Sequence, residues 1–192
     1  MIRRVRADAV ALACATLTLS GCLGDAVPDA SSGPPDQAAV TCGPIQELPD
    51  QGRSHVPEGA PIEPPSRPAT SGPHYPSWLD PAGPVIDQPV DQGLEGYAVH
   101  NLEHGYVFLY YRHARVPPAT IDALAALART EENVMLARYE QLPPDAVVVF
   151  VAWQRLRICS EAGHPDRVTG LARDFIERFR GDAGVAPEPS GP

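Results

Sequence analysis

The sequence predicts a small α+β domain, a two-layer sandwich in which two helices pack on a short, mostly antiparallel sheet. Three observations predict this class. Two segments are rich in β-branched and aromatic residues, as in buried strands, two others carry apolar residues at helical spacing, and an irregular proline-rich arm precedes them. A chain of 192 residues suits one domain with its tails better than two domains.

Residues 106–111 (YVFLYY) and 146–151 (AVVVFV) are the two predicted core strands. Neither alternates between polar and apolar residues, so we expect both in the middle of the sheet, with both faces covered. Residues 156–159 (LRIC) either extend the second strand through Trp153 and Gln154 or fold back as a further strand.

Residues 119–130 and 165–180 are the two predicted helices. Each places apolar side chains three or four positions apart, which gives one helix face that can pack against a sheet. Pro165 is the first residue of the second predicted helix, a position where proline is favoured. Gly181 is expected to end that helix.

The globular domain is predicted to span residues 41–181, followed by a disordered tail at 182–192. Residues 42–93 are rich in proline, which removes backbone donors and disfavours helix. We therefore expect an extended arm that wraps the domain. The alternative, a proline-rich partner-binding stretch, lacks a recurring PxxP series.

Residues 1–21 have the features of an export signal. Three arginines precede the apolar stretch 9–19, which has about half the roughly 20 residues that a membrane-spanning helix needs. The stretch ends in Leu19-Ser20-Gly21-Cys22, the pattern of a bacterial lipobox. Cys22 is therefore the predicted lipidation site; the alternative is an ordinary secretory signal with an incidental cysteine.

An acylated Cys22 would hold the domain at a membrane surface, because each buried methylene contributes about 0.8 kcal/mol. Residues 22–40 are predicted to form the lipidated cysteine and a flexible tether. We expect an extracytoplasmic location, on the periplasmic face of the outer membrane if the cell has two membranes, because no aspartate follows Cys22. The formal net charge of −9 argues against nucleic acid as a partner.

Cys42 and Cys159 are the two cysteines left after the export signal and the lipidation site are set aside. An oxidising compartment favours a disulfide between them. The alternative is a pair of thiolate metal ligands.

The pattern His100-Asn101-Leu102-Glu103-His104-Gly105 is the sharpest functional signal. In a strand the two histidines would lie about 13 Å apart, whereas in a helical turn their Cβ atoms lie about 5–6 Å apart and can share one metal ion. Gly105 favours the helical turn because glycine commonly ends a helix. Two capping or surface histidines are the alternative.

The loop Ser71-Gly72-Pro73-His74-Tyr75-Pro76 holds a third histidine between two prolines. A rigid loop presents an imidazole at small entropic cost, although a turn histidine bonded to the backbone fits the pattern equally well. His55 has less local support and reads on its own as an exposed loop residue.

Residues 71–76 (SGPHYP), 93–112 (GLEGYAVHNLEHGYVFLYYR) and 146–158 (AVVVFVAWQRLRI) resemble a bacterial family, domain of unknown function 3105. Its members carry a PPTSGPHYP-like loop and an HNLEHG-like motif, and the resemblance covers roughly residues 50–180. The family pattern also implies a functional histidine at His55. The chain departs from it at residues 64–70 (PPSRPAT), where the family has a compact Pro-Pro-Thr.

Together these signals predict one metal site formed by His74, His100 and His104, with His55 as a fourth ligand. Imidazole ligands suit Cu(II) or Zn(II). Glu103 is expected to accept a ring N–H from a ligand histidine rather than to bind the ion itself.

The leading functional prediction is a lipid-anchored extracytoplasmic protein that stores, buffers or delivers copper or zinc, a role that favours a non-enzyme over an enzyme. A zinc-dependent hydrolase is the first alternative, because His100-x-x-Glu103-His104 matches an inverted zinc-hydrolase signature. That signature belongs in a long helix, and here Gly105 follows at once. The second alternative is a structural or partner-binding lipoprotein domain without metal.

Overall fold

The computed structural model describes residues 39–64, 66–79, 83–181 and 185–189. The predicted export signal, Cys22 and most of the predicted tether therefore lie outside the described residues. Within the described ranges, no helix is long and apolar enough to cross a membrane.

A mixed sheet of seven strands forms the centre of the domain, in the order β1-β7-β6-β4-β5-β3, with β2 also paired to β7. The strands are β1 (Val40–Cys42), β2 (Gln46–Glu47), β3 (Val85–Ile86), β4 (Val107–Tyr111), β5 (Val134–Arg138), β6 (Val148–Ala152) and β7 (Arg155–Ala162). Strand β5 is parallel to β3 and β4, and the remaining pairs are antiparallel.

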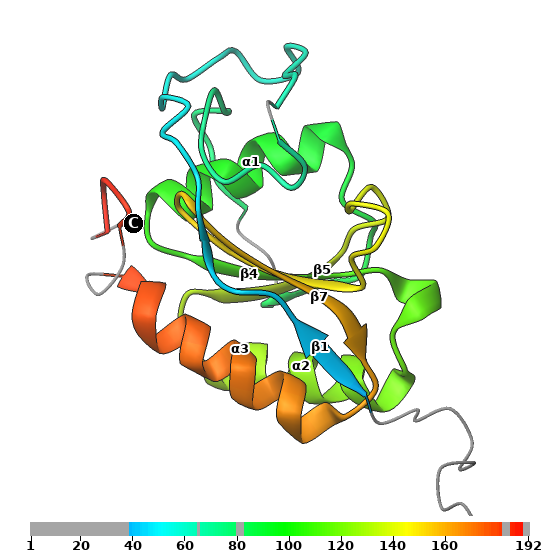
Figure 1. Ribbon diagram of the computed structural model, residues 1–192. Coiled ribbons are helices and arrows are strands. Elements are labelled where there is room, and N and C mark those ends of the chain that lie inside the picture. The colour runs from blue at the N-terminus through cyan, green and yellow to red at the C-terminus, as the bar shows by residue number, and fades with distance from the viewer. Residues whose placement is uncertain (1–38, 65, 80–82, 182–184, 190–192) are drawn as a thin grey trace, which may run out of the picture. The chain divides into compact units, whose positions relative to one another are not determined.

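Three α-helices cover the sheet in the described part of the chain: α1 (Gln92–Glu103), α2 (Pro118–Thr130) and α3 (Pro165–Phe179), with a short 3₁₀ helix at His113–Arg115. Figure 1 shows α2 and α3 on one side of the sheet and α1 on the other, beneath the irregular arm. The domain thus has three layers.

Strand β4 shows how one segment contributes to two cores. All five of its residues are buried, and alternate side chains point to opposite faces. Leu109 packs with the apolar residues of α2 and α3, while Phe108 and Tyr110 pack with those of α1. A strand covered on both faces needs apolar residues at every position, which explains the sequence VFLYY.

The α+β class, both predicted core strands and both predicted helices are confirmed. Residues 156–159 fold back as part of β7, through a turn in which Gln154 has a φ of 56°. The expected numbers of two helices and two layers are wrong, because a third helix, α1, covers the face of the sheet opposite α2 and α3. Strand β5 was not predicted, and it makes the sheet mixed.

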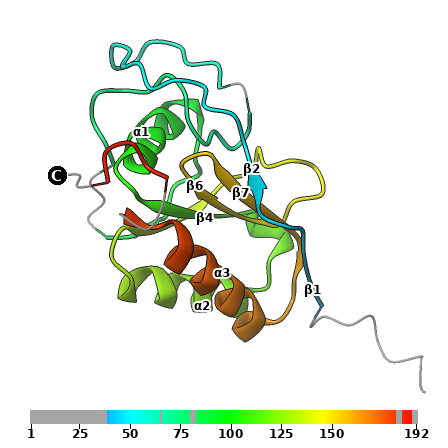
Figure 2. The same cartoon turned by 60° about the vertical axis from the view of Figure 1, so that its left-hand side comes forward.

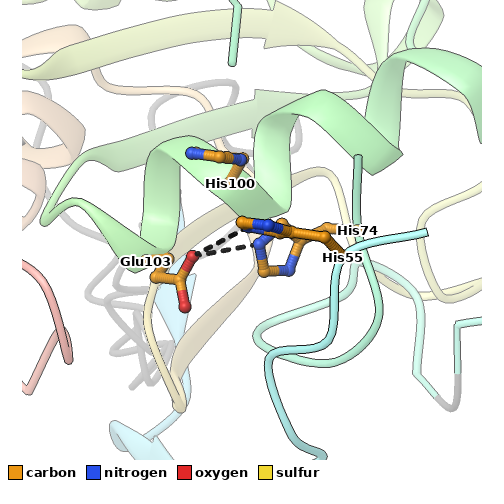
Figure 3. A group of neighbouring side chains, drawn as sticks. All are labelled: His55, His74, His100 and Glu103. Carbon is orange, nitrogen blue, oxygen red and sulfur yellow. Dashed lines mark hydrogen bonds and ion pairs between the residues drawn. The ribbon is translucent and has the colours of Figure 1, made fainter. Parts of the chain in front are cut away.

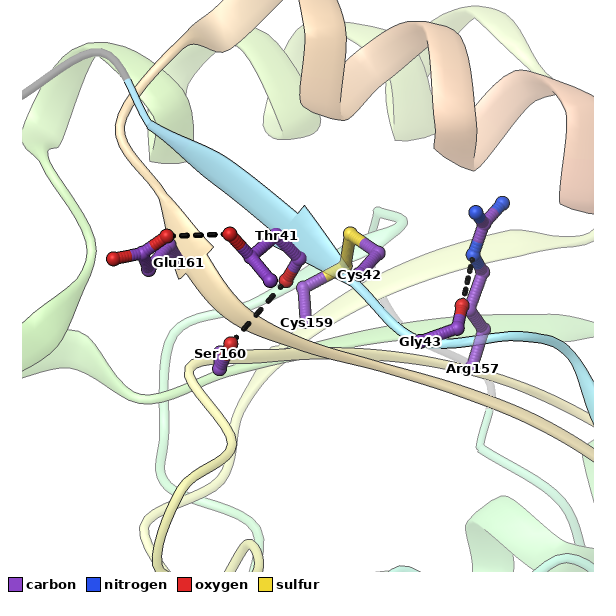
Figure 4. The surroundings of a disulfide bond; sticks show 7 residues. All are labelled: Thr41, Cys42, Gly43, Arg157, Cys159, Ser160 and Glu161. Carbon is purple, nitrogen blue, oxygen red and sulfur yellow. Dashed lines mark hydrogen bonds between the residues drawn. A yellow bond between two sulfur atoms is a disulfide. The ribbon is translucent and has the colours of Figure 1, made fainter.

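The disulfide predicted between Cys42 and Cys159 is present, and it joins β1 to β7. Figure 4 shows it among further links between the arm and β7: Thr41 donates a hydrogen bond to Glu161, and the Arg157 guanidinium donates to the carbonyl of Gly43. The alternative of two thiolate metal ligands is therefore wrong, because each sulfur is bonded to the other.

Residues 185–189 return to α1, as Figure 2 shows. Gly181 N donates to the carbonyl of Gly105 at 2.9 Å, and Glu188 N donates to that of Glu103 at 3.1 Å. A disordered tail therefore does not describe residues 185–189, since the backbone of Glu188 is hydrogen-bonded to the end of the helix.

Candidate metal centre

The C-terminal turn of α1 positions His100, Glu103 and His104. Asp91 caps the start of the helix by accepting a hydrogen bond from Leu94 N at 2.9 Å. The helix ends at Glu103, and Gly105 has a φ of +82°, the left-handed conformation expected from the sequence. Residues three and four apart share one side of a helix, so these side chains lie together.

The loop that carries His74 packs between α1 and the arm. Its backbone pairs with the arm, since His74 N donates to Ser54 O and Val56 N donates to His74 O. This single β-bridge between His55 and His74 brings two predicted residues together. The His74 side chain is completely buried.

Each of three imidazoles has its Nδ1 atom beside a backbone carbonyl. His74 Nδ1 lies 2.8 Å from Gly72 O, His100 Nδ1 lies 2.7 Å from Tyr75 O, and His104 Nδ1 lies 3.0 Å from Glu188 O. A carbonyl can only accept, so each Nδ1 carries a proton. The Nε2 atom of each ring is therefore the one left to contact side chains or a metal ion.

The Nε2 atoms face other potential ligands. His74 Nε2 lies 3.0 Å from Glu103 Oε2, and His100 Nε2 lies 3.0 Å from His104 Nε2. Fixing one ring nitrogen on a carbonyl and aiming the other inward is the usual arrangement of metal-binding histidines.

Four side chains bring their donor atoms close together: His55, His74, His100 and Glu103. Each offers one donor atom, and these atoms all lie within 4.8 Å of one another. Figure 3 shows the Glu103 carboxylate reaching from the helix toward the two histidines of the arm and loop, while the His100 ring lies parallel to that of His55. The His55 side chain is 50% exposed and that of Glu103 only 3%, so the cluster opens to solvent on the side of His55.

Burial lowers the pKa of His100, and positive charge on His74, His104 or His55 would lower it further, against the opposing hydrogen bond to the Tyr75 carbonyl. His100 is therefore neutral at pH 7. A neutral imidazole is the form that binds a metal.

Trp78 borders the open side of the cluster. Its ring centroid lies 5.6 Å from that of His100 and 6.1 Å from that of His104, and the residue is 40% exposed. No pattern in the sequence placed this tryptophan beside the histidines.

Glu95 of α1 holds the segment before the His74 loop, a role that the sequence did not predict. Its carboxylate accepts hydrogen bonds from Ala69 N at 2.7 Å and from the Tyr139 hydroxyl at 2.9 Å. Burial raises the pKa of Glu95, against the lowering effect of both hydrogen bonds. Because Ala69 precedes the loop of His74, these contacts fix that loop to α1.

Gly96 lets the same loop approach the helix. A Cβ atom at this position would lie 2.7 Å from the ring of Tyr75, closer than packed carbon atoms approach. The glycine thus serves close packing of the loop that carries His74, a contact that its position in the sequence did not reveal.

Of the predicted site residues, His55, His74 and His100 come together with Glu103. Glu103 itself contributes a donor atom to the group, beyond the supporting role expected for it. His104 lies beside His100, but it belongs to a second group of donors with Glu103 and Glu188.

The fold and this cluster define an α+β protein with a largely buried histidine–glutamate centre between a helix, a loop and an arm. The family model described as protein of unknown function (DUF3105) matches residues 55–191. That match covers most of the chain, so the protein belongs to this family, as the two sequence motifs indicated. No curated protein and no solved structure gives a significant match.

Proposed function

We propose that this protein binds a divalent copper or zinc ion outside the cytoplasm and stores, buffers or delivers it. The observation that carries the proposal is a group of four donor atoms that all lie within 4.8 Å of one another, with the Nδ1 atoms of His74 and His100 held on backbone carbonyls. A largely buried carboxylate beside three imidazoles needs positive charge, which ring protons or a metal ion can supply.

The spacing of the donors fits one ion. Two ligands about 2.1 Å from a tetrahedral zinc lie about 3.4 Å apart. The Glu103 Oε2 atom is 3.0 Å from His74 Nε2 and 3.8 Å from His55 Nε2, values on either side of that separation. A small adjustment of the half-exposed His55 would complete the ligand set.

The donor types favour Cu(II) or Zn(II). Imidazole nitrogens and a carboxylate oxygen are borderline and hard ligands, whereas Cu(I) prefers sulfur. Met135 is buried in the core, and Cys42 is bonded to Cys159. Among the described residues, therefore, no thiolate or thioether belongs to the group of donors.

Anchoring by Cys22 is part of the proposal. A diacylglyceryl group on this residue and a flexible tether would keep the domain close to a membrane on the extracytoplasmic side. Labelling cells with a radioactive fatty acid tests this, because the wild-type chain should incorporate the label and a Cys22→Ala chain should not.

The zinc-hydrolase alternative is less well supported by the contacts of Glu103. In that chemistry the glutamate acts on a metal-bound water, whereas here Glu103 Oε2 contacts His74 and His55. Its position inside the donor group favours a ligand role over that of a general base.

The test is a metal titration of the mature chain, residues 22–192 with Cys22→Ser and no polyhistidine tag. We expect a dissociation constant below about 1 μM for Cu(II) or Zn(II), and affinity at least about 100-fold weaker in His74→Ala and His100→Ala, since each removes a ligand. The matched control is His113→Ala, an exposed histidine of the 3₁₀ helix, which should bind as wild type.

Binding weaker than micromolar for both metals would overturn the proposal and leave a structural or partner-binding domain. If His100→Ala unfolds, Glu103→Gln provides the same test, because the amide keeps the size of the side chain but removes the charge.

A further inference from the structure

A second group of potential metal ligands adjoins the proposed site and shares Glu103 with it. Donor atoms of Glu103, His104 and Glu188 lie within 4.8 Å of one another. Counting both groups, six side chains surround the end of α1, more than the four ligands that a zinc ion usually takes. One ion therefore leaves His104 and Glu188 unused.

Glu188 is held at this place by its own backbone. Its N–H donates to the carbonyl of Glu103 at 3.1 Å, and its carbonyl accepts from His104 Nδ1 at 3.0 Å. Ala186 packs against the core on the side of α1. The two backbone hydrogen bonds fix the orientation of the His104 ring as well as the position of Glu188.

The contact between His100 and His104 places two ring nitrogens side by side at the end of α1. Their Nε2 atoms are 3.0 Å apart, while both Nδ1 atoms point at carbonyls. A hydrogen bond between the two rings satisfies this contact when one Nε2 carries a proton, and a metal ion on each nitrogen satisfies it when neither does. Ions on the two neighbouring positions would use one lone pair each.

We propose that Glu103, His104 and Glu188 form a second divalent-cation position, with the Glu103 carboxylate shared between the two ions. This rests on the proposed function, since the first ion occupies the group of His55, His74 and His100. Two-metal sites place their ions about 3.5–4 Å apart. With two carboxylates and one imidazole, the second position has a larger share of hard oxygen ligands than the first. It should therefore favour Zn(II) over Cu(I).

Arg53 competes for the same carboxylate. Its guanidinium lies 3.6 Å from Glu188 Oε1, and both side chains are about half exposed. An ion at the second position displaces Arg53, because the carboxylate exchanges one cation for another. Arg53→Ala should therefore strengthen binding of the second ion by a few-fold, as expected for an exposed ion pair.

The test measures bound zinc per mature chain after equilibrium dialysis against Zn(II). We expect two ions for wild type, one for Glu188→Ala, and two for the matched control Glu177→Ala, which changes an exposed glutamate of α3. Glu188→Ala leaves the two backbone hydrogen bonds in place. Arg53→Ala should bind two, the second at a lower zinc concentration than in wild type.

One zinc ion per wild-type chain, or two in Glu188→Ala, overturns the second position and leaves the proposed function intact. No bound zinc or copper overturns both. Two ions in wild type with one in Glu188→Ala support the shared centre.

Discussion

Breaking the disulfide should be the most damaging covalent change to the domain. The perturbation is the double substitution Cys42→Ala/Cys159→Ala. The two cysteines are separated by 117 positions, and in the chain-entropy account a loop of that length is worth about 5 kcal/mol of unfolding free energy. Small domains have a total stability of about 5–15 kcal/mol, so a large part of the stability depends on this bond.

The assay is urea unfolding of metal-free wild type, double variant and wild type reduced with a phosphine. We expect the reduced and substituted proteins to unfold at similarly low urea concentrations, because both lose the same constraint on the unfolded chain. Adding Zn(II) at 100 times its dissociation constant should return about 2.7 kcal/mol. A loss of stability below about 1 kcal/mol in both altered proteins would refute the reasoning.

Three further outcomes are expected. Glu95→Gln should become more stable relative to wild type as pH rises above 4.5. The pKa of the buried Glu95 carboxyl is raised, so wild type loses stability as pH rises from 4.5 to that raised pKa, whereas the glutamine variant does not. Equal dependence of the unfolding free energy on pH in the two proteins would contradict this. Gly105→Ala should cost about 1–3 kcal/mol in thermal unfolding, since φ is +82° and the new Cβ would lie 2.8 Å from Gly181 Cα; an unchanged melting temperature would contradict it. Metal affinity should fall as pH drops through about 6, where imidazoles protonate. Because the pKa of His100 is lowered, this residue should protonate only at a lower pH. A metal affinity that stays constant from pH 8 to 5 in isothermal titrations would exclude histidine ligation.

The parts of the fold that the sequence predicted are those with a strong local pattern. Strand β4 is apolar at every position, and α2 and α3 repeat their apolar residues at helical spacing. Helix α1 lacks such a pattern, because Gly93 and Gly96 interrupt it and one histidine, one asparagine and two glutamates occupy further positions. Its stability comes from burial against the sheet and the arm, which only the tertiary structure reveals.

Strand β5 escaped prediction for a related reason. The strand has only five residues (VMLAR). It follows two glutamates and Asn133, which has a φ of 54°. Parallel pairing with β4 decides its conformation, and that pairing joins segments on either side of α2.

The candidate site was predictable where motifs are compact. HNLEHG and SGPHYP identified His74, His100 and His104, and the family resemblance added His55. The roles of Glu95 and Glu188 were not predictable, because each depends on a partner far away in the sequence: Ala69 and Tyr139 for Glu95, and Glu103 and His104 for Glu188.

The placement of Trp78 gives the protein an intrinsic optical reporter. Of the two tryptophans in the chain, Trp153 is buried in the core, whereas Trp78 lies against the rings of His100 and His104. An ion bound by either imidazole changes the surroundings of one indole and leaves the other unaltered. A paramagnetic ion such as Cu(II) would quench the emission of Trp78, while closed-shell Zn(II) would shift it without quenching, so one fluorescence titration distinguishes the two metals without any added dye.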